Sequence, residues 1–202
     1  MASKAIHRFT EEQYLAIEES SEERHEFFEG EMFAMSGGTA AHARLQTDIV
    51  AELASRVDHR SCEAFGPDMR IQIQATGLYT YPDASVICGG TRFADASQTS
   101  VLNPTVVVEV LSPSTESYDR GKKFQHYRQI ESLRDYVLIS QNEVLVEHYT
   151  RQADGTWTLR DHARRDDELK LDTIGISIPL TAIYRRVEFE AQSEALHPGA
   201  NG

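Results

Sequence analysis

The stretch Val106-Val107-Val108-Glu109-Val110-Leu111 (VVVEVL) decides how the rest of the chain is interpreted. An extended segment with this sequence is apolar on both faces except at Glu109. That pattern is typical of a central strand that is covered on both sides. The turn-forming segment Ser112-Pro113-Ser114-Thr115 follows it and ends the strand. We therefore predict a buried strand over residues 106–111.

Glu109 is the charged exception in this strand. A carboxylate in a doubly covered strand loses its hydration, which costs several kcal/mol unless a cation, a metal or hydrogen bonds compensate. A plainer alternative is that Glu109 lies near the end of the strand, where it reaches water or pairs with Arg70 or Arg120. Both interpretations are open at this point.

The segments on either side alternate between strand and helix patterns. In the segment that runs from residue 64 to residue 74, apolar and polar residues alternate. This alternation predicts a strand with one face exposed to solvent. Thr76-Gly77 turns the chain into a partner strand over residues 79–88, with Pro82 where a ladder hydrogen bond can be spared. After the central strand we predict a helix over residues 118–130 and a strand over residues 136–139.

The two ends of the chain add further elements. Thr10-Glu11-Glu12-Gln13 has the form of a capping box, which predicts a helix that runs to about Ser20. A hairpin centred on Glu29-Gly30 is predicted over residues 25–35, and a second helix opens at Thr39. Its apolar stripe consists of Leu45, Ile49, Leu53 and Val57. Near the C-terminus we predict a hairpin over residues 144–159 and further strands at residues 169–171 and 174–178.

This order predicts a mixed α/β fold in which helices pack on a mixed sheet. A chain of 202 residues suits one compact domain, which we place at residues 1–190, with a disordered tail at residues 191–202. No apolar run approaches the length of a membrane helix, and no signal peptide is present, so we expect a cytoplasmic protein. Cys62 and Cys88 form no CxxC motif, and we expect both to be plain thiols.

Asp83 is the second carboxylate of interest. It follows Pro82 in the strand before the central one, and neighbouring strands lie about 4.8 Å apart. On a shared face, Asp83 and Glu109 could hold one divalent ion, and two carboxylates suit Mg²⁺. A Pro-Asp pair alone is a weak signal, because it also occurs in ordinary turns.

A cation is expected on the helix that follows. At 100° per residue, Lys123 lies about 40° from the apolar stripe that contains Tyr127, whereas Lys122 lies about 140° away. Lys123 should therefore point toward the sheet, where it could hold or deprotonate a water molecule. The alternatives are a lysine that covers apolar surface, or Arg120 in the same role.

Three motifs follow one another along the chain: Tyr81-Pro82-Asp83, VEVLSPST over residues 108–115, and DRGKK over residues 119–123 with Tyr127. In these motifs the chain resembles the Uma-type putative restriction endonucleases, a branch of the PD-(D/E)XK nuclease superfamily. The resemblance extends from about Phe9 to Phe189. It implies a restriction-endonuclease-like core in the order α-β-β-β-α-β, with an N-terminal helix and hairpin and a β-rich C-terminal extension.

The resemblance also implies roles for single residues. Asp83 and Glu109 would be metal ligands, and Lys123 would complete the catalytic set. The superfamily usually has its lysine two positions after the glutamate, where this chain has Leu111; in this branch the lysine lies on the following helix. Glu31, His42, Arg120 and Tyr127 are further active-site candidates. For Glu31 and His42, the alternatives are a solvated hairpin carboxylate and a satisfied helix histidine.

The implied activity is hydrolysis of phosphodiester bonds in DNA by a homodimeric endonuclease that depends on Mg²⁺, with Mn²⁺ as a substitute. The net charge of -12 opposes nucleic-acid binding, so we expect Arg70, Arg120 and Lys123 to form a local basic patch that faces Asp83. One alternative is an inactive relative that keeps the fold as a binding or assembly module. Another is a two-carboxylate glycoside hydrolase, which the single Trp disfavours.

Overall fold

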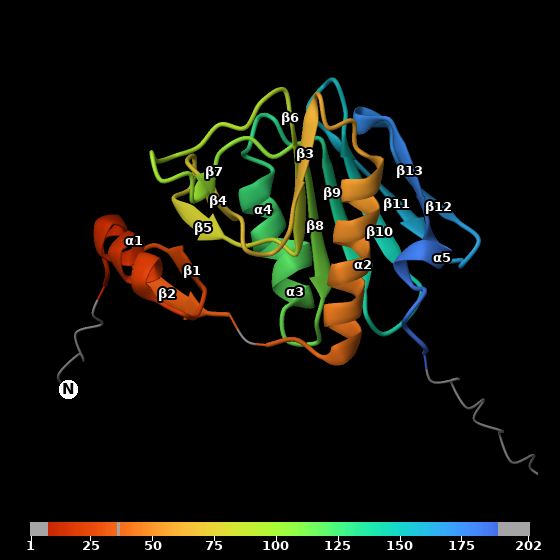
Figure 1. The fold of residues 1–202 in the computed structure, drawn as a ribbon, viewed down its shortest axis with the longest axis horizontal. Helices are drawn as coiled ribbons and strands as arrows, with labels where there is room; N and C mark the ends of the chain where they lie inside the picture. Colours follow the sequence, from red (N-terminus) through yellow and green to blue (C-terminus); the bar gives the residue numbers. More distant parts are fainter. Residues whose placement is uncertain (1–7, 36, 190–202) are drawn as a thin grey trace, which may run out of the picture.

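The structure is a computed structural model that describes residues 8–35 and 37–189. Over these residues the strands form sheets of five, six and two strands (Figure 1). The six-stranded sheet consists, in spatial order, of β11 (Trp157–His162), β10 (Val146–Arg151), β9 (Asp135–Ser140), β8 (Val106–Leu111), β6 (Ala84–Cys88) and β3 (Cys62–Phe65). Every residue of β8 is buried, so the predicted central strand is confirmed.

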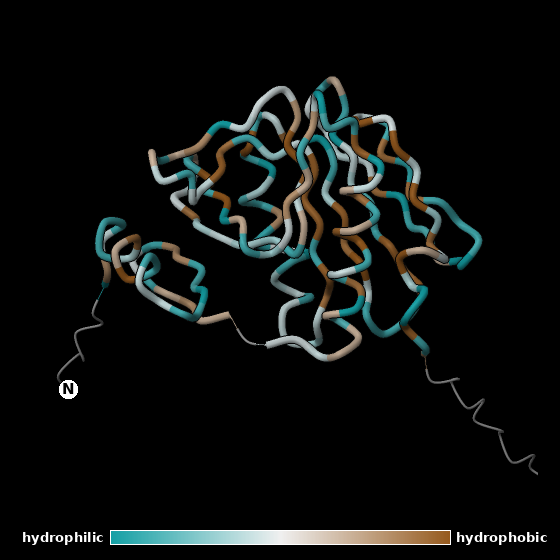
Figure 2. The backbone as a smooth tube through the Cα atoms, in the orientation of Figure 1, coloured by the Kyte–Doolittle hydropathy of each residue, from teal (hydrophilic) through white to brown (hydrophobic). Residues whose placement is uncertain are grey.

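Helical segments cover both faces of this sheet. On one face α2 (Ala40–Arg56) packs with β12 (Glu168–Leu171), β13 (Ile176–Pro179) and α5 (Leu180–Ile183), and η2 (Asp172–Ile174) joins β12 to β13. The predicted cap Thr39 accepts a hydrogen bond from the backbone N–H of His42, and the predicted stripe of α2 lies in the core. Figure 2 shows hydrophobic segments concentrated where the sheet and α2 meet.

The other face is covered by the segment that we predicted as one helix over residues 118–130. It consists of α3 (Glu116–Tyr118), the π-helical turn η1 (Asp119–Lys123) and α4 (Phe124–Tyr127). Single π-helical turns are rare in proteins as a whole, and those that occur are often found at functional sites. Within the six-stranded sheet and its helices, the chain order is α2, β3, β6, β8, α3 to α4, then β9. This is the predicted α-β-β-β-α-β order in a mixed α+β fold.

The five-stranded sheet carries the N-terminal elements. Its strands, in spatial order, are β2 (Glu31–Ala34), β1 (His25–Phe28), β5 (Leu78–Thr80), β4 (Arg70–Ile73) and β7 (Ser100–Val101). The hairpin turn at Glu29-Gly30 has φ values of 49° and 85°, as a tight left-handed turn requires. The capping box at Thr10 is present, and α1 (Glu11–Ser20) stacks Tyr14 on Phe27.

The predicted strand over residues 79–88 is wrong in one respect, because the structure divides it between two sheets. β5 pairs within the five-stranded sheet and β6 within the six-stranded sheet, and Tyr81-Pro82-Asp83 joins them. Pro82 has no N–H to contribute to a ladder, which favours a break at this point. The segment from residue 64 is divided in the same way, between β3 and β4. Asp83 therefore lies directly before β6, at one end of the six-stranded sheet.

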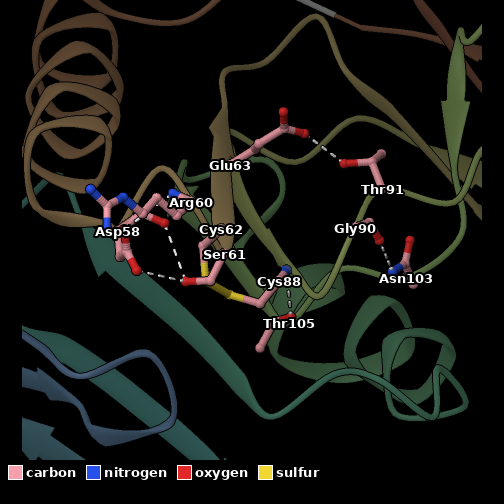
Figure 3. The surroundings of a disulfide bond; sticks show 10 residues. All are labelled: Asp58, Arg60, Ser61, Cys62, Glu63, Cys88, Gly90, Thr91, Asn103 and Thr105. Carbon is pink, nitrogen blue, oxygen red and sulfur yellow. Dashed lines mark hydrogen bonds between the residues drawn. A yellow bond between two sulfur atoms is a disulfide. The ribbon is translucent and has the colours of Figure 1, made fainter.

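The expectation of two plain thiols is wrong, because Cys62 and Cys88 form a disulfide (Figure 3). β3 and β6 are antiparallel, and their register places Cys62 directly opposite Cys88. The two Cα atoms are 4.1 Å apart. The bond joins the edge strand β3 to the rest of the sheet.

Reduction of this disulfide should lower the free energy of unfolding by about 3 kcal/mol, because the bond closes a loop with a sequence separation of 26 residues in the unfolded chain. Guanidinium denaturation with and without a reductant measures the difference. A variant with Cys62→Ala and Cys88→Ala should not respond to the reductant. Equal midpoints for the oxidised and reduced wild-type protein would contradict this prediction.

In the part of the chain that the structure describes, no helix is long and apolar enough to cross a membrane. The tail predicted at residues 191–202 lies outside the described residues. The division of residues 1–190 as a single domain stays a prediction.

Candidate active site

Glu109 projects from β8 into the layer that holds α3, η1 and α4, and its side chain is buried. Its Oε1 accepts a hydrogen bond of 2.9 Å from the hydroxyl of Tyr127. Nζ of Lys123 lies 2.9 Å from the same oxygen. The cation opposite Glu109 is therefore Lys123, and the alternative pairings with Arg70 or Arg120 are not what the structure shows.

Lys123 ends the π-helical turn and is 6% exposed, whereas its neighbour Lys122 is exposed. The predicted orientation of these two lysines is confirmed. Nζ of Lys123 also lies 3.2 Å from Oε1 of Glu26 and 3.7 Å from Oδ1 of Asp119. Burial opposes the charge of Lys123, but the carboxylates of Glu109, Glu26 and Asp119 outweigh it and raise the pKa of Lys123 well above its ordinary value. Lys123 is therefore an ammonium group at neutral pH.

Glu26 and Asp119 belong to this cluster, and sequence reasoning did not select either of them. Glu26 lies in β1 and accepts a hydrogen bond from the hydroxyl of Thr80 on β5. Its neighbour Phe27 points to the opposite face, toward Tyr14. The successive pair Glu26-Phe27, one charged and one aromatic, was the available signal that the two side chains face opposite ways. For Asp119, the signal was its i,i+4 spacing from Lys123.

Asp83 approaches the cluster from the start of β6. Continuing the register of Ala84 opposite Val108 places Asp83 opposite Glu109. Oδ2 of Asp83 accepts a hydrogen bond of 2.6 Å from the backbone N–H of Val110. The structure thus brings Asp83 and Glu109 to the same end of the sheet.

Helix α2 supplies the other contacts of Asp83. Nε2 of Gln46 donates a hydrogen bond of 2.5 Å to Oδ1 of Asp83, and Nε2 of His42 lies 3.6 Å from Oδ2. The sequence-predicted candidate His42 therefore lies beside Asp83. Gln46 was missed, although it occurs one helical turn after His42 on the same side of α2.

The cluster carries more negative than positive charge. Burial raises the pKa of Glu109 well above its ordinary value, Lys123 lowers it, and the charges of Asp119 and Asp83 raise it further. Burial likewise raises the pKa of Asp119, against the effect of Lys123. A divalent cation would relieve this repulsion between carboxylates.

The donor set fits a hard cation that binds few protein ligands. Carboxylate oxygens of Asp83 and Glu109 are the ligand type of Mg²⁺, which usually keeps several waters and uses one or two carboxylates plus phosphate oxygens. Among the described residues, no group of three or more His, Cys, Asp or Glu side chains is arranged to hold a metal ion. The site therefore offers the sparse oxygen ligands of Mg²⁺ or Mn²⁺ and no complete protein cage.

Other candidates lie outside the cluster. Arg120 donates hydrogen bonds to Glu147 at 2.7 Å and to Glu116 at 2.9 Å, and it makes no ion pair with Glu109. Glu31 is exposed on β2. The structure places neither of these two residues against Lys123.

The predicted basic patch of Arg70, Arg120 and Lys123 does not form. Arg70 is buried, donates hydrogen bonds to Ser100 and Thr99, and lies over the rings of Tyr14 and Tyr79. Side chains alternate along β4 and β5, so Arg70 shares the face of Tyr79 while Thr80 shares the face of Glu26. Arg70 and Lys123 are thus on opposite sides of the five-stranded sheet.

Comparison with known proteins identifies the family of the chain. The family Uma2, described as putative restriction endonuclease, matches residues 11–181. The chain belongs to this family. All the residues of the Lys123 cluster, together with Asp83 and Gln46, lie within the matched range.

Two relatives and one solved structure are similar over most of the chain. Uncharacterized protein slr1290 of Synechocystis sp. is 38% identical, with 90% of this chain and 94% of the relative covered. Uncharacterized protein sll1609 of the same organism is 36% identical, with 83% and 94% covered. The crystal structure of a putative nuclease belonging to DUF820 from Anabaena variabilis matches with a TM-score of 0.69 at 18% identity. It covers 86% of this chain and 96% of that chain, which establishes the shared fold.

Proposed function

We propose that this protein is a Mg²⁺-dependent endonuclease that hydrolyses phosphodiester bonds of nucleic acid, with DNA as its substrate. The observation that carries the proposal is that Asp83 lies opposite Glu109 at one end of the sheet and that Glu109 contacts the buried ammonium group of Lys123. Two carboxylates and one cation beside them are the groups that metal-assisted phosphodiester hydrolysis requires. Membership of the family supports the same reaction class.

Asp83 and Glu109 would hold the Mg²⁺ ion, and Mn²⁺ should substitute for it. When bound, the ion polarises the scissile phosphate and lowers the pKa of a bound water. The N–H of Val110 and the amide of Gln46 fix the carboxylate of Asp83, and Tyr127 fixes that of Glu109. These hydrogen bonds hold both ligands in place before a substrate arrives.

The charge state of Lys123 restricts the role that this residue can have in catalysis. A lysine whose pKa is raised well above its ordinary value stays protonated at neutral pH, so it is a poor general base. Its ammonium group can instead orient the attacking water and stabilise the charge that develops on the phosphate. We therefore assign Lys123 to orientation and charge stabilisation.

The proposal also covers the substrate and the assembly. The net charge of -12 repels nucleic acid at long range, and monovalent salt screens this repulsion, so cleavage should slow less with rising salt than it does for a basic DNA-binding protein. The homodimer implied by the family resemblance stays a prediction, and light scattering after size-exclusion chromatography measures it.

Covalently closed circular DNA should be cut in Mg²⁺ or Mn²⁺ and left intact in EDTA, because the two carboxylates cannot position a phosphate without a cation. An assay on circular DNA, linear DNA and single-stranded RNA separates endonuclease action from exonuclease action and DNA from RNA. Asp83→Asn should abolish cleavage, whereas Asp154→Asn, a change in an exposed hairpin turn, should not. Equal cleavage in EDTA, or no cleavage of any substrate, would count against the proposal and favour an inactive binding module.

A further inference from the structure

Strand β2 carries an aromatic side chain that is exposed to solvent. Phe33 is 50% exposed, and Met35, just after the strand, is 42% exposed. β2 is the outermost strand of the five-stranded sheet, next to β1 (Figure 1). Single exposed apolar residues are common on protein surfaces and need no explanation by themselves. The place of Phe33 relative to the Lys123 cluster is therefore the observation that matters.

Phe33 lies on the face of the sheet that carries this cluster. In the antiparallel register of β1 and β2, Phe33 is directly opposite Glu26. Side chains of opposite residues share a face, and their Cβ atoms are about 4.5 to 5.5 Å apart. The adjacent Met32 packs on the other face, against the group that contains Phe27. Because Nζ of Lys123 lies 3.2 Å from Oε1 of Glu26, Phe33 is one side chain removed from Lys123.

The charges around Phe33 disfavour a phosphate at this position. Glu31 is exposed on the same face of β2, two residues from Phe33. The guanidinium of Arg24, which precedes β1, lies 3.8 Å from Asp68 and over the ring of Tyr81. A phosphate against Phe33 would therefore meet a carboxylate and no free cation of β1 or β2. An uncharged, flat group such as a nucleobase fits an aromatic ring in these surroundings.

A second aromatic side chain borders the same cluster from α3. Tyr118 is half-buried, and burial and the charge of Glu26 raise its pKa to about 12. Its hydroxyl is therefore neutral at physiological pH. Aromatic side chains of β2 and of α3 thus both lie close to Glu26, which contacts Lys123.

We propose that a base of an unpaired substrate strand stacks on Phe33, beside the phosphate that lies at the Lys123 cluster, so that the protein prefers single-stranded DNA. The inference rests on the proposed function, because it takes this cluster as the place of the phosphodiester bond. Bases of a duplex stack on one another, so a base reaches Phe33 only after it has left the stack. Stacking on an aromatic ring needs no cation, which suits a protein of net charge -12 in which the predicted basic patch does not form.

Fluorescence anisotropy of a labelled DNA oligonucleotide of mixed sequence, as a single strand and as a duplex, tests the proposal with the full chain in EDTA. The wild-type protein should bind the single strand more tightly than the duplex. Phe33→Ala should weaken single-strand binding about 5- to 150-fold, the range for one base stacked on an aromatic ring, and Phe33→Trp should retain it. Leu159→Ala is the matched control, because Leu159 is 49% exposed on β11, three strands away from β8. Its affinity should be unchanged.

Four outcomes would overturn the proposal: no binding of the single strand by the wild-type protein, tighter binding of the duplex, unchanged affinity in Phe33→Ala, or equal weakening in Leu159→Ala. These outcomes differ from failure of the nuclease proposal, because binding in EDTA involves no cleavage. Cleavage in Mg²⁺ without Phe33-dependent binding would overturn only the stacking role. Phe33-dependent binding without cleavage in Mg²⁺ would overturn the nuclease activity and leave a module that binds single strands.

Discussion

Lys123→Ala is expected to slow Mg²⁺-dependent DNA cleavage by about 10²- to 10⁴-fold, the usual effect of removing a positioned catalytic group. The neighbouring variant Lys122→Ala should cleave at nearly the wild-type rate, because Lys122 is exposed and Lys123 is buried against Glu109. Single-turnover cleavage of a substrate that the wild-type protein cuts measures both rates. Equal rates for the two variants would refute the role of Lys123.

The contacts of Lys123 require a second variant in this experiment. Without its ammonium group, Glu109, Glu26 and Asp119 would be buried together uncompensated, and breaking a buried pair costs about 3 to 5 kcal/mol. Lys123→Ala could thus lose activity through unfolding. Lys123→Arg retains the positive charge but not the compact ammonium group, so it should keep the fold and still cleave slowly. Circular dichroism of each variant separates the two causes.

Local patterns were sufficient to predict the part of the site that lies along β8 and the segment after it. A lone charge among apolar residues in VVVEVL indicated that Glu109 needed a buried partner. The predicted direction of the Lys123 side chain was calculated as a helical angle relative to Tyr127. The two residues are separated by one turn of regular helix at α4. The π-helical turn lies before this interval, so it did not alter the angle between them.

Contacts between distant segments could not be predicted in this way. Glu26 reaches Lys123 only because the five-stranded sheet packs against η1, and nothing in the hairpin sequence fixes that packing. The disulfide depends on the register of β3 and β6, which the sequence separation of 26 residues between Cys62 and Cys88 does not reveal. Arg70 was placed on the wrong face because its strand was assumed to share a sheet with Glu109.

Glu109→Gln is expected to abolish Mg²⁺-dependent cleavage and, in EDTA, to raise the free energy of unfolding. The amide keeps an oxygen that accepts from Tyr127 and Lys123, while Lys123 keeps its ion pairs with Glu26 and Asp119. The variant therefore removes the buried charge of Glu109 and still leaves Lys123 with negatively charged partners. Burial of an ion costs several kcal/mol in lost hydration, and the neutral amide removes that cost.

The stabilisation should depend on pH in a defined direction. Burial raises the pKa of Glu109 in the folded protein well above its value in the unfolded chain. Below the ordinary glutamate pKa, Glu109 is protonated in both states and resembles glutamine. As the pH rises through the interval between the two values, the wild-type protein loses stability that the Gln variant keeps. The difference between the two proteins should therefore be larger at pH 8 than at pH 5.

Urea denaturation in EDTA at both pH values measures this difference, with Glu147→Gln as the control. Glu147 pairs with Arg120 outside the Lys123 cluster, so its replacement should cost up to about 1 kcal/mol and show no gain in stability at pH 8. A Glu109 variant that is less stable than wild type at pH 8 would show that the carboxylate stabilises the fold. The ion pairs around Lys123 would then be a structural network. A variant that is more stable than wild type at pH 8 would instead indicate that Glu109 is kept for cation binding at a cost in stability.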